Sequence, residues 1–289
     1  MSESVAELRF EAIGAPWQIE TPAPLSPELV AQIQARIETY DATWSRFRPD
    51  SLVTQVAQSA GRWDFPEDAV ALFAFYRRLY DATAGAVTPL VGRRLEDLGY
   101  DRDYRLTPRA KLATVPRWDD VMSWDGEVLT TTEPIVLDVG AAGKGYLVDI
   151  VAGLLRDAGH DEYVVDGSGD MVHRGQGPVR VGLEHPFDPE LAIGVRELRN
   201  GALCASAPGR RTWGTGLHHI LDGLTGEPTT AVAATWAAAA TGLEADGLAT
   251  ALFFTPGETL AREFDFEYVR MFPDSRVEHS STWAGELFT

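Results

Sequence analysis

Residues 137–149, Leu-Asp-Val-Gly-Ala-Ala-Gly-Lys-Gly-Tyr-Leu-Val-Asp, place three glycines, one lysine and two aspartates where an apolar run meets an amphipathic helix. Glycine lets the backbone approach a ligand closely. Lys144 would lie beside the exposed N–H groups of the first helical turn, which favour anions. The segment therefore indicates a phosphate-bearing ligand. It is neither a P-loop nor a Rossmann loop, because Asp138 occupies the first glycine position and Gly145 follows the lysine.

Asp246 and Thr250 form a second candidate site. Residues four apart lie on one face of a helix, and a carboxylate and a hydroxyl are hard oxygen donors suited to Mg²⁺. The alternative is a solvated helix face on which the threonine bonds back to the preceding turn. Asp138 and Asp149, which flank the glycine segment, leave a similar choice. They could bind a ribose hydroxyl or a metal, or they could cap backbone donors.

Two further groups of residues could contact phosphate. His219, with Asp222 close by in a glycine-containing loop, could act as a general base or as a phosphate ligand. It could equally be a structural strand residue, with His218 on the opposite face. Ser206 and Arg211 lie in a loop that contains two arginines. Arginine suits bidentate phosphate contact, and surface solvation is the competing explanation.

The composition of the 289-residue chain excludes several classes of protein. A net charge of −18 argues against a broad nucleic-acid interface, because phosphate binding needs clustered Lys and Arg. No apolar run approaches the ~20 residues of a membrane span. No His/Cys cluster has zinc spacing, and no G-x-S-x-G elbow is present. The acidic first residues do not resemble a signal peptide, and Cys204 alone allows no intrachain disulfide, so we expect a cytoplasmic protein.

The elements that must position these residues alternate without a regular βαβ order. Helical spacing of apolar residues predicts helices over 27–42, 66–83, 144–158 and 243–254. Apolar or alternating runs predict strands over 7–13, 17–20, 135–139, 162–165, 178–184, 192–198 and 201–206. Residues 230–239 fit a buried strand or a helix start, and residues 166–170 are typical of a tight polar turn. The mixture indicates an α+β fold, one compact unit of two intertwined halves.

The order of these blocks resembles the FAD:protein FMN transferase family, the ApbE flavin transferases, over roughly residues 35 to 260. The family's blocks are S-R-F/Y-x-P-x-S-x-L, G-A/G-x-D/T/S-P, D-L-G-G/A-I/A-A/G-K-G-Y-x-x-D, a glycine-rich turn, T-S-G, H-I-I-D-P-x-T-G and A-D-x-x-x-T-A-L-F. The corresponding residues here are, in order, 45–52, 85–89, 138–149, 166–170, 205–207, 219–226 and 245–253.

The resemblance implies an ApbE-like (T-fold-like) arrangement of β-sheets flanked by helices, as a single domain over residues 1–289. It also implies an enzyme that uses Mg²⁺ and binds FAD as its substrate. Such an enzyme cuts the FAD pyrophosphate, moves FMN onto a Thr or Ser hydroxyl of an acceptor flavoprotein and releases AMP. Mg²⁺ would offset the pyrophosphate charge in an acidic protein. The acceptor supplies the nucleophile, so the enzyme needs no activated Ser or Cys of its own.

By matching positions, the resemblance implies that Asp246, Thr250 and the backbone carbonyl of Gly143 bind the metal. His219 and Asp222 would lie near the pyrophosphate, with His219 as the candidate base for the acceptor hydroxyl. The residues implied to contact FAD are Ser45, Thr88, Asp138, Lys144, Tyr146, Asp149, Gly167, Gly169, Ser206 and Arg211.

The chain departs from the family pattern at three places. Ala205-Ser-Ala207 replaces T-S-G, Gly223 replaces the proline of H-I-I-D-P, and Gly143 replaces the alanine before the lysine. Loss of one hydroxyl contact would cost about 1 kcal/mol. Two alternatives therefore stay open. One is an FAD pyrophosphatase that uses water as the acceptor, and the other is an FAD-binding protein with little catalysis.

Overall fold

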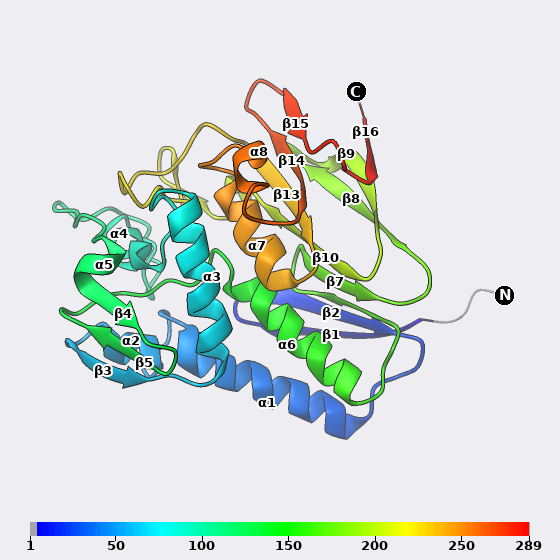
Figure 1. The fold of residues 1–289 in the computed structure, drawn as a ribbon, viewed down its shortest axis with the longest axis horizontal. Coiled ribbons are helices and arrows are strands. Elements are labelled where there is room, and N and C mark those ends of the chain that lie inside the picture. The colour runs from blue at the N-terminus through cyan, green and yellow to red at the C-terminus, as the bar shows by residue number, and fades with distance from the viewer. Residues whose placement is uncertain (1–4, 289) are drawn as a thin grey trace.

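The computed structural model describes residues 5–288, and its centre is an antiparallel sheet of eight strands (Figure 1). In spatial order these are β1 (Ala6–Ala12), β2 (Ala15–Thr21), β6 (Tyr163–Asp166), β7 (Asp170–Arg174), β10 (Gly201–Ser206), β13 (Ala234–Ala239), β14 (Glu267–Met271) and β15 (Val277–His279). Strands from both ends of the chain share this sheet, so the two halves are intertwined. The predicted α+β class is confirmed.

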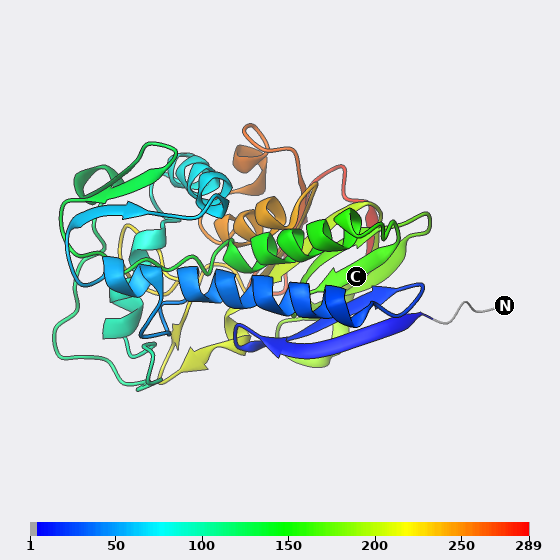
Figure 2. The same ribbon diagram turned by 90° about the horizontal axis from the view of Figure 1, so that it is seen from below.

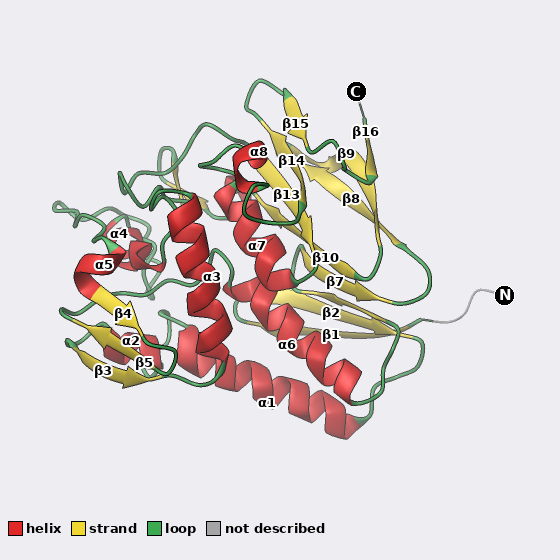
Figure 3. Cartoon of the chain, viewed as in Figure 1, coloured by secondary structure: helices red, strands yellow, loops and turns green. Residues whose placement is uncertain are grey.

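Four long helices cover one face of the sheet (Figures 2 and 3). They are α1 (Pro27–Trp44), α3 (Asp68–Ala82), α6 (Gly143–Asp157) and α7 (Gly242–Ala251). Helices α6 and α7 contact the strands and each other, and α1 and α3 pack on these two helices. The largest apolar core fills this helical layer and the face of the sheet beneath it. Within residues 5–288, no helix has the length and apolar character that crossing a membrane requires.

Smaller elements complete the fold. A sheet of β16 (Gly285–Leu287), β9 (Asp188–Leu198) and β8 (Val179–His185) shares a second apolar core with the strands of the main sheet. The other sheets are β3 (Gly61–Asp64), β5 (Val128–Thr131) and β4 (Met122–Trp124), and the pair β11 (Thr212–Trp213) and β12 (Leu217–His218). The short helices are α2 (Leu52–Val56), α4 (Gly92–Asp97), α5 (Trp118–Val121), α8 (Gly257–Leu260), η1 (Pro89–Val91) and η2 (Pro208–Arg210).

Local sequence signals explain the helices that frame the site. Helix α1 begins where the Ser26 hydroxyl accepts the N–H of Leu29 and Pro27 occupies the first turn. Its apolar residues at helical spacing, Ile33 and Ile37 among them, are buried. The four predicted helices are confirmed, with ends that differ by at most three residues.

The strand predicted over 135–139 is wrong. These residues pair with no strand, and the N–H of Asp138 donates instead to the carbonyl of Pro89, at 2.8 Å. Leu137 is fully buried, so the apolar run reflects a covered connection between β5 and α6. Burial requires apolar residues in such a connection as much as it does in a strand.

Candidate active site

The two most distinctive sequence blocks meet where α6 crosses α7. A Cβ atom on Gly145 would lie 2.2 Å from the carbonyl oxygen of Gly242, so only glycine allows the backbones to approach this closely. Asp149 fixes the same crossing, because its two carboxylate oxygens accept the N–H groups of Gly242 at 2.7 Å and of Leu243 at 2.8 Å. Asp149 therefore caps the N-terminus of α7, which is the capping alternative left open above.

This crossing assembles a cluster of oxygen atoms. The Asp246 carboxylate accepts the N–H of Gly145 at 2.9 Å, and the Thr250 hydroxyl donates to the carbonyl of Ala141 at 3.2 Å. Asp246 and Thr250 thus lie along the glycine segment on one face of α7, as their spacing predicts. The bond of Thr250 reaches across to another element and does not return to its own preceding turn.

The donor set fits a divalent cation. Burial, followed by the nearby Asp170, raises the pKa of Asp246 well above its ordinary value. A cation would relieve that unfavourable negative charge. Carboxylate, hydroxyl and carbonyl oxygens are the ligands that Mg²⁺ prefers. Within residues 5–288, no group of three His, Cys, Asp or Glu side chains could hold a metal, so a cation here would depend on hydroxyl and carbonyl oxygens.

The choice of carbonyl differs from the sequence expectation. The carbonyl of Gly143 accepts the buried Tyr40 hydroxyl at 2.9 Å, whereas the carbonyl of Ala141 lies against Thr250. Ala141 therefore joins Gly143 as a candidate ligand.

Lys144 is bound to the turn at residues 166–170. Its ammonium group lies 2.5 Å from the buried Asp170 carboxylate, 2.5 Å from the carbonyl of Gly167 and 3.3 Å from that of Ser168. Burial alone would lower the pKa of Lys144, but Asp170 and Asp246 raise it overall. Gly169 adopts a φ of +94°, which glycine allows without strain. Lys144 therefore joins the start of α6 to this turn, in addition to any contact with phosphate.

Asp138 pairs with an arginine that the sequence interpretation did not select. Arg46 Nε lies 2.6 Å from the Asp138 carboxylate, which also accepts the N–H of Gly140 at 2.8 Å. Burial opposes ionisation of this carboxyl group, yet Arg46 holds the pKa of Asp138 below its ordinary value. Ser45, next to Arg46, ends α1, and its N–H donates to the carbonyl of Asp41. Arg46 thus connects the block at 45–52 to the block at 138–149. Its position next to Ser45, inside the first block, is the sequence feature that could have identified it as a site residue.

The 85–89 and 219–226 blocks also touch. The N–H of Gly223 donates to the carbonyl of Ala86 at 2.8 Å, a bond that proline could not make. A Cβ atom on Gly223 would lie 2.6 Å from the buried Thr88 side chain. Asp222 stabilises the same loop, because its carboxylate accepts the N–H of Leu224 at 2.8 Å.

The neighbouring histidines have different environments. His218 is buried, and its Nε2 lies 2.8 Å from the carbonyl of Thr229, which indicates a structural role. The Nδ1 atom of His219 is buried and has no hydrogen-bond partner among the described residues. Burial, then Arg211 and His218, lowers the pKa of His219 to about 3, so this ring is neutral near pH 7. Residue 219 follows β12, which ends at His218.

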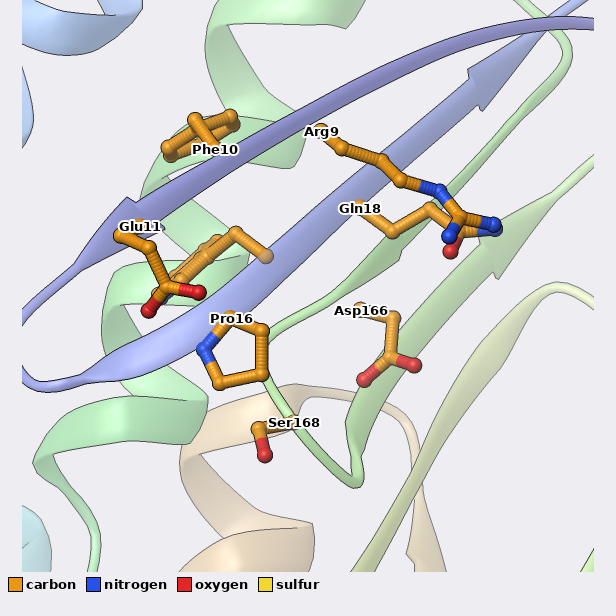
Figure 4. A pocket seen from close by; sticks show the side chains of 8 residues that line it. Arg9, Phe10, Glu11, Pro16, Gln18, Asp166 and Ser168 are labelled. Atoms are coloured by element: carbon orange, nitrogen blue, oxygen red, sulfur yellow. The ribbon is translucent and has the colours of Figure 1, made fainter.

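Two predicted contacts lie at the edges of this arrangement. Ser206 ends β10 opposite Thr235. Tyr146 packs edge-on against Tyr40 with ring centroids 6.3 Å apart, and burial raises its pKa to about 12. The outer side of the 166–170 turn borders a shallow hollow of about 460 Å³ (Figure 4). Its lining contains none of the predicted metal or catalytic residues, so this hollow does not define the site.

The antiparallel sheet and the helices that pack on it define an α+β protein whose candidate site lies at the crossing of α6 and α7. The chain belongs to the ApbE family, whose model matches residues 13–268. It is 27% identical over 245 residues to the FAD:protein FMN transferase of Klebsiella pneumoniae, covering 78% of this chain and 70% of the relative. The corresponding Escherichia coli protein is 24% identical over 278 residues, with 86% and 78% covered.

Solved structures share the fold. Flavin Transferase ApbE from Vibrio cholerae matches with a TM-score of 0.80 at 21% identity, covering 96% of each chain. The ApbE protein of Thermotoga maritima matches with a TM-score of 0.82 at 22% identity, covering 96% of this chain and 98% of the other. The predicted family is therefore confirmed, and the names of the relatives agree with the predicted enzyme class, a flavin transferase.

Proposed function

We propose that this protein transfers the FMN half of FAD to a Thr or Ser hydroxyl of an acceptor flavoprotein, in a reaction that needs Mg²⁺ and releases AMP. The supporting observation is the buried Asp246 carboxylate beside Thr250 and the glycine-rich start of α6. The chain also belongs to a family whose relatives named above are FAD:protein FMN transferases.

Charge explains why a metal belongs in this reaction. A pyrophosphate brought to a chain of net charge −18 is repelled unless positive charge is supplied locally. Lys144 shares its charge with Asp170, so it neutralises a phosphate only in part. Asp246, Thr250 and the carbonyl of Ala141 or Gly143 would hold the cation. When bound, Mg²⁺ supplies positive charge to the pyrophosphate and to the departing AMP.

The protein's own task is then to position the reactants and move one proton. The acceptor oxygen forms a bond to the phosphorus of the FMN half, and the bond from that phosphorus to the AMP oxygen breaks. AMP leaves with the electron pair, and His219 accepts the hydroxyl proton. The ring can accept a proton because it is neutral near pH 7. An anionic substrate nearby would raise the low pKa of His219 towards the working pH.

Incubation with FAD, Mg²⁺ and a panel of flavoproteins tests the proposal. We expect a covalently fluorescent acceptor band whose mass increase corresponds to one FMN. Asp246→Ala should abolish the band, whereas Asp157→Ala, an exposed carboxylate at the end of α6, should keep it. An active Asp246→Ala enzyme would show that the metal assignment is wrong, and an unlabelled panel would contradict FMN transfer.

Hydrolysis of FAD to FMN and AMP is the second candidate. It is favoured by Ala205-Ser-Ala207, which lacks the threonine and the glycine of the family's T-S-G block. Formation of FMN and AMP without any acceptor, at a rate comparable with transfer, would support it.

A further inference from the structure

Residues 102–111, here called the 102–111 loop, differ in charge from the rest of the chain. All ten residues are exposed. They include four of the 25 Lys and Arg residues, Arg102, Arg105, Arg109 and Lys111, and only one acidic residue, in a chain of net charge −18. Arg105 pairs with Asp101 at 2.9 Å and Arg109 lies 3.6 Å from Asp97, whereas Arg102 and Lys111 have no carboxylate partner among the described residues. The segment therefore offers a positive charge at an exposed position of an acidic protein.

The loop has a defined shape. The N–H of Leu106 donates to the carbonyl of Gly99 at 2.8 Å, and that of Arg109 donates to the carbonyl of Asp97 at 2.7 Å. The Tyr104 ring stacks on Phe47 with centroids 5.6 Å apart and an interplanar angle of 10°. The loop is therefore held as a fixed surface on α4 and on the residues that follow α1.

Two exposed apolar residues in this loop have strained backbones. Tyr104 and Leu106 adopt φ values of 47° and 52°, in the left-handed region that residues with a side chain rarely occupy. They are 55% and 43% exposed, so burial does not compensate for the strain. Strain of this kind, held in place by surrounding bonds, is typical of functional surfaces.

The loop borders the candidate site. Arg94 on α4 donates to the carbonyl of Ala113, just after the loop, at 3.3 Å, and to that of Gly226 at 2.7 Å. Gly226 ends the block that begins with His219. Phe47, beneath Tyr104, follows the Arg46 that pairs with Asp138. Figures 1 and 2 both place the segment after α4 at the same end of the molecule as the connections between β10 and β13.

We propose that the 102–111 loop binds the acceptor protein at an acidic surface of the acceptor, around the threonine or serine that is modified. This inference depends on the proposed function. Most of this chain repels an acidic partner, and the loop attracts it, so charge alone orients the acceptor hydroxyl towards the site. Tyr104 and Leu106 add apolar contact at the centre of that surface.

Variants in which arginine or lysine is replaced by uncharged glutamine test this docking surface. The loop variant is Arg102→Gln/Arg109→Gln/Lys111→Gln, and Arg105 is kept because it bonds to the carbonyls of Glu96 and Thr107. The matched control, with the same change in net charge, is Arg174→Gln/Arg180→Gln/Arg199→Gln, at exposed positions on or beside β7, β8 and β9. The probe is the acceptor that the wild-type protein labels with FMN.

At low salt we expect the loop variant to raise the KM for the acceptor about tenfold, as three exposed charge contacts would. Its kcat, its KM for FAD and its thermal unfolding should match those of the wild type, and the control should be unchanged. High salt should reduce the difference in acceptor KM between the loop variant and the wild type, because ions screen exposed charges. The double variant Arg102→Gln/Lys111→Gln, which leaves the Arg109–Asp97 pair intact, should show a smaller rise in the same direction.

An unchanged acceptor KM in the loop variant, or an equal rise in the control, would overturn the docking surface. A rise in the KM for FAD in place of the acceptor KM would show that the loop binds FAD, and this result would also overturn the docking surface. If the wild-type protein labels no acceptor, the proposed function is wrong. If the wild type labels the acceptor but the loop variant has the same acceptor KM, only the docking surface is wrong.

Discussion

The buried carboxylate of Asp246 is costly unless a cation accompanies it. It is 6% exposed, and the Lys144 ammonium, which favours its ionised form, is also paired with Asp170. With one ammonium between two carboxyl groups, burial and Asp170 raise the pKa of Asp246 well above its ordinary value, so ionising it is unfavourable without a further cation. Apolar surroundings penalise an ionised Asp246 strongly, which is why we propose that this site binds a divalent ion.

Magnesium should therefore stabilise the wild-type protein and not Asp246→Asn, which keeps an acceptor oxygen for the Gly145 N–H. A Mg²⁺ concentration a hundredfold above Kd adds about 2.7 kcal/mol to the free energy of unfolding, which corresponds to a rise in Tm of about 5 °C or more. Thermal unfolding with and without Mg²⁺ measures this, with Asp157→Asn as the control. An equal rise in Asp246→Asn would place the ion elsewhere.

Asp149 should make the free energy of unfolding depend on pH. Burial raises its pKa to about 6, although the N–H groups of Leu243 and Gly242 lower it. Since the folded state binds this proton more tightly than the unfolded chain does, the stabilisation is complete below about pH 4 and is lost as the pH rises through 6. Relative to Asp149→Asn, the wild type should lose at most about 3 kcal/mol between these values. Urea unfolding of both proteins measures the difference, and parallel pH curves would show that Asp149 does not titrate there.

The sequence predicted the residues that depend on local spacing. Asp246 and Thr250 share a helix face because they are four apart. The partners of Lys144 and Asp138 could not be predicted in the same way, because Asp170 and Arg46 are remote in sequence and are brought close only by packing. Residue type alone also left open whether Asp149 binds a ligand or caps a helix, and the answer depends on where α7 begins.

At the scale of elements, the crossing of α6 and α7 positions the oxygen cluster. Gly145 and Gly242 allow the two helix backbones to make direct contact, and this contact places Asp246 and Thr250 beside residues 141–145. The site is thus a property of two helices that start close together, and carboxylates bind N–H groups of both first turns, Asp246 at α6 and Asp149 at α7.

Gly145→Ala should separate these helices. Its Cβ would meet the Gly242 carbonyl, so overpacking of about 3 kcal/mol outweighs the roughly 1 kcal/mol gained in helix propensity. The variant should unfold at lower temperature and lose Mg²⁺ stabilisation. Gly153→Ala on the same helix meets nothing closer than 3.8 Å and should stabilise the protein by about 0.5–1 kcal/mol. Comparable Tm values for the two variants would contradict the tight crossing.

Periodicity predicted the amphipathic helices well because one buried face repeats along each of them. It failed at 135–139, where a covered connection carries the same apolar residues as a strand. It also assigned no strand to residues 267–271, which form β14. All but one of those residues are buried, and the two polar ones pair with partners elsewhere in the fold, so the run lacks the alternation that marks a half-exposed strand.

For the whole molecule, the net charge of −18 and the mixed sheet order limit what can bind and where. The acidic composition discourages polyanions except where Lys144, Arg211 and the proposed cation would supply positive charge, and except at the 102–111 loop. The blocks at 45–52 and 245–253 both contact the glycine segment at 138–149, through Arg46 and Asp246, although about two hundred residues separate them.

The ratio of AMP released to FMN attached tests the central claim most directly. The protein is incubated with FAD, Mg²⁺ and the labelled acceptor, AMP is quantified by chromatography, and acceptor-bound FMN is quantified by mass spectrometry. We predict one AMP for each FMN on the acceptor, with neither product when the metal is chelated. AMP accompanied by free FMN, or acceptor labelling that persists without metal, would contradict metal-dependent FMN transfer.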